Sequence, residues 1–102
     1  MSPAVGAELK DLHPCIVVQS DLIEHELRAR TVVVPVTSRA PKRPLPFVIP
    51  LSPQEGGLTK ESFAQCDQVT RIDKSRAVRR MGQMSQTSMS KINKALALVL
   101  EL

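Results

Sequence analysis

Hydrophobic residues in this chain gather in short runs that are separated by proline, glycine and charged residues. Three of these runs, at residues 15–19, 31–38 and 47–51, are rich in β-branched side chains, which favour pleated strands. Pro35 and Pro50 fall inside two of the runs, and proline cannot donate a hydrogen bond to a strand ladder. The pattern therefore predicts short strands, and the two that contain proline are predicted to be edge strands or to carry a bulge.

The second half of the chain changes from short runs to a helical period. Residues 62–72 alternate weakly and predict a fourth strand region, and residues 79–84 predict a last strand with Gly82 as a kink or a point of close approach. Ser85 then begins a helix in which apolar side chains recur every three or four positions: Met89, Ile92, Ala95, Leu96 and Val99. Such a stripe predicts a face that packs on the core.

The connecting segments are rich in residues that break regular structure. Residues 1–12 predict a solvent-exposed loop, and residues 39–46, with their prolines and cations, predict an exposed connection. Residues 52–57 predict a turn whose Gly-Gly pair can take positive φ. A short helix is predicted over residues 22–27.

These elements predict one small domain of the mainly β, or α+β, class. At 102 residues the chain can bury one modest core, and 42% hydrophobic content argues against disorder. Short strands joined by turns and followed by one C-terminal helix favour a strongly bent antiparallel sheet. Trp and Tyr are absent and Phe occurs twice, so the core is predicted to be aliphatic and base stacking on an aromatic sheet surface is excluded.

The charge distribution favours an anionic partner. The net charge is +4, and the cations gather near residues 28–30, 39–43 and 74–80. Thr37 and Ser38 end one predicted strand directly before the second of these clusters, and hydroxyls beside cations are groups that hold phosphates. Nucleic acid is therefore the first ligand to test, with ordinary surface charge as the alternative interpretation.

The two cysteines and the termini indicate a reduced compartment. Cys15 and Cys66 each lie in an apolar run, which favours two buried thiols in the cytoplasm, and a disulfide stays open. His13 and Cys15 could share a strand face, but two ligands do not make a zinc site. Neither a signal peptide nor an apolar run of membrane-spanning length is visible, so a cytoplasmic protein without membrane contact is expected.

Six segments carry recognisable motifs in chain order: residues 3–8, 13–21, 34–38, 55–68, 71–85 and 100–102. In the same order they resemble D-P-x-x-G-x-E, R-P-x-x-V-x-x-N/D, P-x-T-S, G-G-L…S-V-x-x-C-D-Q, T-I-D-K…I-G-x-L-S and the S-L-G-L tail, which are motifs of the MazF/PemK/Kid family of toxin–antitoxin endoribonucleases. The ordered set spans nearly the whole chain, which makes it far more specific than any single motif.

The resemblance implies an SH3-like (CcdB/MazF/Kid-type) antiparallel barrel with a C-terminal helix, as a single domain of residues 1–102. It implies a homodimer, and a cognate antitoxin whose acidic C-terminal peptide covers the RNA groove. The implied activity is cleavage of single-stranded RNA at short sequences without a metal or other cofactor. Attack of a 2′-hydroxyl on its neighbouring phosphate would leave a 2′,3′-cyclic or 3′-phosphate and a free 5′-hydroxyl.

This chemistry needs a base, an acid and donors to the phosphoryl oxygens. The residues that the resemblance implies for catalysis are Thr37, His13 and Glu8. Thr37 would donate to phosphate, and Glu8 would orient a cation or accept a proton. The residues implied for RNA binding, of which Asp67 and Gln68 would alternatively brace a dimer, are Ser38, Arg39, Lys42, Arg43, Lys10, Asp67 and Gln68.

Two departures from the family pattern bear on activity. His13 stands where the family has arginine, and histidine can move protons but cannot form a permanently charged fork to phosphate. Arg39 or Lys10 would then supply the charge. The family's first strand, of the type R-G-E-I-W-x-V-x-L, is also not found before residue 3, which predicts an exposed sheet edge or one covered by a dimer partner.

These departures leave a second function open. The chain could be a non-catalytic binding protein on the same fold, which blocks a macromolecular target as CcdB-type toxins do or sequesters RNA or an antitoxin. Thr37, Ser38 and the basic connection favour the enzyme, whereas His13 and the lacking strand favour the binder.

Overall fold

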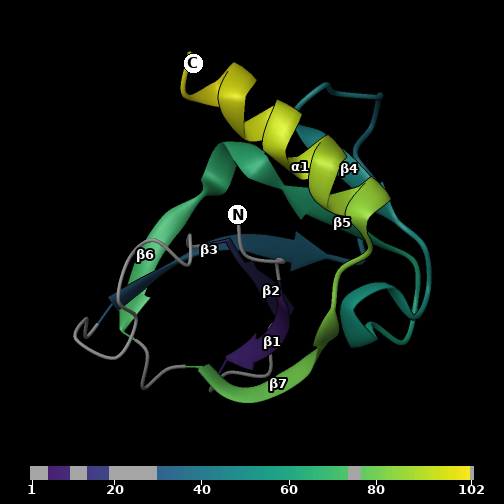
Figure 1. The fold of residues 1–102 in the computed structure, drawn as a ribbon. Helices are drawn as coiled ribbons and strands as arrows, with labels where there is room; N and C mark the ends of the chain where they lie inside the picture. Colours follow the sequence, from purple (N-terminus) through teal and green to yellow (C-terminus); the bar gives the residue numbers. More distant parts are fainter. Residues whose placement is uncertain (1–4, 10–13, 19–29, 74–76, 102) are drawn as a thin grey trace.

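The computed structural model describes residues 5–9, 14–18, 30–73 and 77–101. Seven strands form one curled antiparallel sheet with the order β4-β5-β3-β2-β1-β7, and β6 pairs with β3 beside β5 (Figure 1). The elements are β1 (Val5–Leu9), β2 (Pro14–Val17), β3 (Arg30–Thr37), β4 (Val48–Leu51), β5 (Ser62–Gln65), β6 (Thr70–Asp73), β7 (Ala77–Gln83), the 3-10 turns η2 (Glu55–Gly57) and η3 (Cys66–Gln68), and helix α1 (Gln86–Val99). The predicted bent sheet with a C-terminal helix is confirmed.

Strand β3 lies in the middle of the sheet, so of the two alternatives predicted for Pro35, an edge strand or a bulge, the edge strand is wrong. On one side β3 pairs with β2, with Pro35 opposite Cys15. On the other side its start pairs with β6 and its end with β5. The ladder on that side is interrupted between Val33 and Val36, where the missing N–H of Pro35 costs no ladder bond. Pro50 does lie in an edge strand, β4, as predicted.

The predicted single strand over residues 62–72 is wrong in one respect, because it is divided into β5 and β6 by the turn η3. Residues 65–69 of this run stand opposite only two residues of β3, at positions 34 and 35. The extra residues form the 3-10 turn, which acts as an enlarged bulge. Pro35 predicted an irregularity in the pairing of β3, and the irregularity appears as the turn η3 between the two strands that pair with it, β5 and β6.

Residues 5–9 form strand β1, so the predicted loop over residues 1–12 is wrong for this part. β1 pairs with β2 and with β7, so β2 is not an edge strand of the described sheet. Gly6 and Ala7 are weak strand formers, but both are buried between the two neighbouring strands. Tertiary pairing overrides their local preference here. The helix predicted over residues 22–27 lies outside the described residues.

The core is aliphatic, as predicted, and lies between the curled sheet and α1. Its main cluster includes Val34, Leu51, Ala64 and Cys66, and Ile92 of the helix packs into it with no exposed surface. The predicted helix begins at Ser85, whose hydroxyl accepts a hydrogen bond from the Ser88 N–H at 3.2 Å. In the described part of the chain no helix has the length and hydropathy to cross a membrane.

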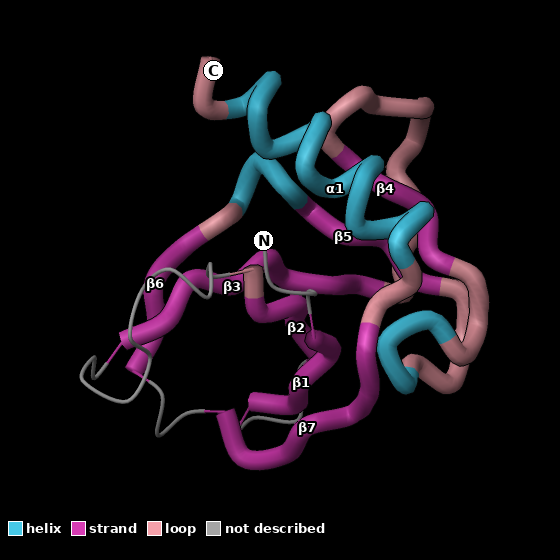
Figure 2. Tube along the Cα trace, viewed as in Figure 1, coloured by secondary structure: helices cyan, strands magenta, loops and turns pink. Residues whose placement is uncertain are grey.

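Glycines bring the turn η2 close to the paired strands β1 and β7. Figure 2 shows this turn beside β7. Gly56 and Gly57 take φ of 60° and 82°, which confirms the predicted turn. A Cβ at Gly6 would overlap the carbonyl oxygen of Gly56, and a Cβ at Gly82 would lie 2.9 Å from the Gly57 nitrogen, so the predicted close approach at Gly82 is confirmed. From the same turn, Glu55 Oε1 accepts a hydrogen bond of 2.5 Å from the N–H of Ser85, which ties η2 to the start of α1.

Candidate nucleic-acid interface

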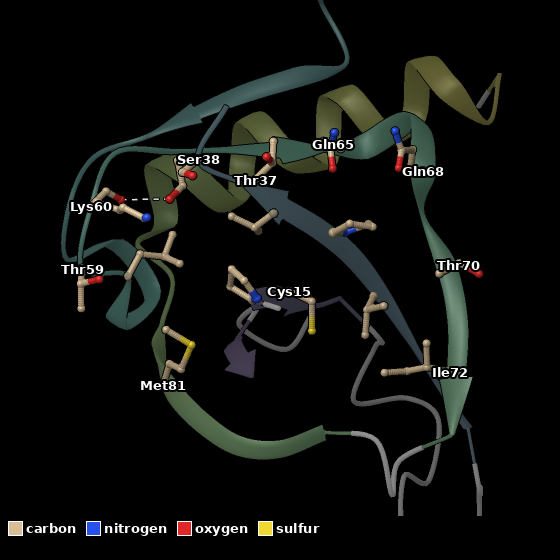
Figure 3. A pocket seen from close by; sticks show the side chains of 16 residues that line it. Cys15, Thr37, Ser38, Thr59, Lys60, Gln65, Gln68, Thr70, Ile72 and Met81 are labelled. Carbon is tan, nitrogen blue, oxygen red and sulfur yellow. Dashed lines mark hydrogen bonds between the residues drawn. The ribbon is translucent and has the colours of Figure 1, made fainter. Parts of the chain in front are cut away.

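The curled sheet encloses a cavity of about 720 Å³ that has an apolar interior and a polar mouth (Figure 3). Strands β2, β3, β6 and β7 supply the apolar lining, which includes Cys15, Val33, Ile72 and Met81. The polar side chains come from the end of β3 and the residue after it, from the turn before β5, from both ends of β5, from η3 and from the start of β6. They are Thr37, Ser38, Thr59, Lys60, Ser62, Gln65, Gln68 and Thr70. Apart from Ser62, which is buried, these polar residues are exposed or partly exposed, so polar groups meet solvent above an apolar base.

A second cavity of about 250 Å³ adjoins the first one. It is lined by the connection after β3, including Arg39, and by Asp67 of η3. Thr37, Gln65 and Gln68 line both cavities and so stand between them. We call these three residues the polar ridge. A chain molecule laid across the ridge would place groups in both cavities.

Thr37 is the last residue of β3, and its side chain is only partly buried. Its Oγ1 accepts a hydrogen bond from the N–H of Arg39 at 3.2 Å. A hydroxyl that accepts one bond still has its proton to donate. The arrangement fixes the threonine oxygen and leaves its O–H available to an acceptor such as a phosphoryl oxygen.

The structure brings together only part of the predicted site. Thr37, Ser38 and Gln68 line the first cavity, and Arg39 and Asp67 line the second. Lys42 and Arg43 are exposed in the predicted connection and line neither. Their placement leaves them as peripheral cations.

The remaining predicted site residues come from the first part of the chain. Glu8 is half-buried on β1 opposite Pro14, and it does not belong to the lining of either cavity. His13 and Lys10 lie outside the described residues. The grouping of Glu8 with Thr37 in one cavity, which the resemblance implies, is therefore not found in the described lining.

Four polar residues of the cavity mouth were not predicted: Thr59, Lys60, Gln65 and Thr70. Gln65 and Gln68 lie three positions apart across η3, and only a turn between two strands brings both to the ridge. Lys60 lies between the Gly-Gly turn and β5, where its exposure resembles that of any surface lysine. The pattern of the sequence carried no signal for either position.

The two cysteines are buried and unbridged, which confirms one of the two alternatives left open. Burial, followed by the charge of Asp67, raises the pKa of the Cys66 thiol from 9.0 to about 11. The Cys66 sulfur is thus protonated at neutral pH and is not a nucleophile.

Among the described residues, no group of three or more His, Cys, Asp or Glu side chains could hold a metal ion.

The raised pKa predicts a loss of stability in alkaline solution. The folded protein holds the Cys66 proton more tightly than the unfolded chain, so this contribution is complete below pH 9 and declines as the pH approaches about 11. A shift of this size corresponds to at most ~3 kcal/mol of unfolding free energy. Urea unfolding near pH 9 and near pH 11 should show a smaller decline for Cys66→Ala than for the natural chain. Equal declines would contradict the prediction.

A strongly curled sheet with hydroxyls, amides and a cation at one mouth defines a small protein suited to bind an anionic chain molecule. Comparison of the chain with known protein families and structures makes this class specific. The chain belongs to the family described as PemK-like, MazF-like toxin of type II toxin-antitoxin systems, whose model matches residues 1–100.

One relative, Endoribonuclease MazF9 of Mycobacterium tuberculosis, is 33% identical over 106 aligned residues, which cover 100% of this chain and 89% of that protein. The fold resembles that of the Mycobacterium tuberculosis toxin MazF-mt6, with a TM-score of 0.81 at 20% identity over 99% of this chain and 98% of that one. It also resembles a mycobacterial endoribonuclease solved in complex with its cognate antitoxin, with a TM-score of 0.78 at 24% identity over 98% and 92% of the two chains.

Proposed function

We propose that this protein is the toxin of a type II toxin–antitoxin system and that it cleaves single-stranded RNA without a metal ion. The observation that carries the proposal is the polar ridge with Ser38 beside it, in a chain of the PemK-like, MazF-like family. The relative MazF9, which is named an endoribonuclease, supports the same activity.

In the proposed reaction the 2′-oxygen of one nucleotide forms a bond to the adjacent phosphorus while the bond to the 5′-oxygen breaks. A base takes the proton of the 2′-hydroxyl, and an acid gives a proton to the leaving 5′-oxygen. Thr37 and Ser38 donate hydrogen bonds to the phosphoryl oxygens, on which negative charge increases. Glu8 and His13 are the proposed proton carriers, and Pro14, which follows His13 in the chain, lines the first cavity.

The two cavities give the RNA strand its proposed course. A phosphate lies at the polar ridge, and the bases on either side enter the two cavities. The amide groups of Gln65 and Gln68 can hydrogen-bond to base edges. The first cavity offers aliphatic side chains and prolines for contact with a base, while Phe47 contributes to the second.

Cleavage in the presence of EDTA tests the activity. The purified protein is expected to cut a long single-stranded transcript in EDTA and to leave 5′-hydroxyl ends. An oligoribonucleotide that spans a mapped site should resist cleavage once deoxyribose replaces the ribose whose 2′-oxygen attacks. The matched control carries deoxyribose at the next nucleotide, and it should be cut at the normal rate. Persistent cutting of the first substrate would exclude the mechanism.

The family also supports proposals about partners. A cognate antitoxin would bind through an acidic C-terminal peptide to the cations around the cavities, among them Arg39 and Lys60. The structure of the mycobacterial relative with its antitoxin supports a partner of this kind. A homodimer in the cytoplasm is the form in which we infer that the toxin acts.

One observation favours the alternative, a binding protein without catalysis. The described residues that line the first cavity include neither a carboxylate nor a histidine, although the reaction needs a base and an acid. A protein that only binds RNA or another macromolecule needs no base or acid. The hydrogen-bond donors and Lys60 at the mouth of the first cavity would suffice for binding.

A further inference from the structure

Lys60 is the only charged residue among the described residues that line the first cavity. It belongs to the turn before β5 and is exposed to solvent. Figure 3 shows Lys60 and Ser38 near one end of the row of polar side chains, followed by Thr37, Gln65 and Gln68. Arg39, which was expected to supply charge to the site, lines the smaller cavity instead.

The backbone of Lys60 is anchored on both sides. Ser62 is 3% exposed, and its hydroxyl donates a hydrogen bond of 2.9 Å to the carbonyl oxygen of Lys60. Ser62 is also the only polar residue among the buried ones that the structure describes. Leu58, on the other side of Lys60, is buried in the core. A long surface side chain normally loses much freedom when it binds an anion, and a fixed backbone reduces that cost.

The Ser62 hydroxyl is hydrogen-bonded although it is buried, so its burial leaves no unsatisfied donor. The bond holds the carbonyl group of Lys60 and so restrains the backbone from which the Lys60 side chain leaves the turn. The cavity has hydroxyl and amide donors on the ridge, but only Lys60 contributes a full positive charge to the described lining. An anion at Thr37 and Ser38 would therefore be drawn toward this end of the mouth.

We propose that Lys60 binds the RNA phosphate next to the one that Thr37 holds, and that Ser62 is the residue that positions Lys60. This inference rests on the proposed binding and cleavage of RNA. Lys60 provides the permanent charge that histidine at position 13 cannot, as a point charge and not as a two-pronged fork. The phosphate is recognised by charge alone, so this contact carries affinity and no sequence preference.

The salt dependence of RNA binding by Lys60→Gln tests the proposal. The probe is the oligoribonucleotide with deoxyribose at the cut site, which binds without being cleaved. Loss of one phosphate contact on a single strand should reduce the slope of log K against log salt by about 0.7. Affinity at low salt should fall about ten-fold, as for a lost hydrogen bond to a charged group. KM should rise in proportion, and kcat should change little.

Lys91→Gln is the matched control, because it removes the same charge from the exposed surface of α1 outside both cavities. It should leave the slope and KM unchanged. Equal slopes for Lys60→Gln and the natural protein would overturn the inference. If the natural protein neither binds nor cuts RNA, the proposed function itself fails, and the two failures are thus distinguishable.

The Ser62→Ala variant tests whether Ser62 positions Lys60 or only stabilises the fold. In the natural background it should weaken RNA binding three-fold or more, by the energy of one hydrogen bond of ~0.7 kcal/mol or above. In the Lys60→Gln background it should have no effect on RNA binding, because Ser62 acts through Lys60. Equal losses of affinity in both backgrounds would show a general structural role and would overturn the assignment of Ser62.

Discussion

The Thr37→Ala variant is expected to cut RNA ~100-fold to 1000-fold more slowly than the natural protein, since loss of one donor to a developing oxyanion has this effect in other enzymes. The loss should fall on kcat, because charge on the phosphoryl oxygens grows only as the 2′-oxygen attacks. The methyl group of Thr37 contributes little to the core, since the side chain is only partly buried. The thermal midpoint should therefore change by a few degrees at most, and single-turnover cleavage of the mapped oligoribonucleotide is the measurement.

Two further substitutions make this result interpretable. Thr37→Ser keeps the hydroxyl and should retain most of the rate. Thr87→Ala removes an exposed threonine at the start of α1 outside both cavities, and it should behave as the natural protein does. If Thr37→Ala cuts RNA at the normal rate, Thr37 has no role in the chemistry.

Growth inhibition by the same variants distinguishes the two candidate functions. An RNA-cleaving toxin should lose its toxicity with Thr37→Ala, because arrest of growth depends on the chemical step. A toxin that blocks its target by binding alone should keep most of its toxicity, because one lost hydrogen bond weakens a large interface only modestly. Toxicity that survives in a variant with no measurable cleavage would favour the binding protein.

The strands and the helix were predictable where the sequence has a clear local pattern. The valines at positions 32–34 fix β3, and the spacing of Ile92 and Ala95 fixes the buried face of α1. β1 was missed because Gly6 and Ala7 have no strand preference of their own. The pairing of β1 with two distant strands decides its structure, and such long-range pairing leaves no periodic signal.

The candidate site was predictable only in part for a related reason. The motif at residues 35–38 identified Thr37 and Ser38, which do line the cavity. Gln65 lies on the ridge because residues 65–69 stand opposite only positions 34 and 35 of β3. This mismatch depends on the register between segments that are distant in the sequence. Lys60 depends on a turn that Ser62 stabilises from a buried position. Register and turn geometry arise from the assembled sheet, so neither residue could be assigned from its own neighbourhood.

The largest effect on stability is expected from Gly6→Ala. The added Cβ would overlap the carbonyl oxygen of Gly56, which is backbone and cannot turn aside as a side chain could. Either β1 must separate from β7 or the turn η2 must leave the sheet, and η2 also holds the start of α1 through Glu55. The expected loss in unfolding free energy is ~3–4 kcal/mol, a large share of the total for a domain of this size. The thermal midpoint should fall by about 12 °C or more.

Comparison with two other variants makes the prediction for Gly6 specific. Gly82→Ala should cost less, because its added Cβ would have 2.9 Å to the nearest atom, the Gly57 nitrogen. Gln83→Ala, at an exposed position of β7 opposite Val5, should change the unfolding free energy by less than ~0.5 kcal/mol. Urea unfolding of the three variants should therefore give the order Gly6→Ala, Gly82→Ala, Gln83→Ala from least to most stable. A Gly6→Ala variant as stable as Gln83→Ala would show that β1 and η2 do not meet at this junction, because a backbone contact this close leaves no room for a methyl group.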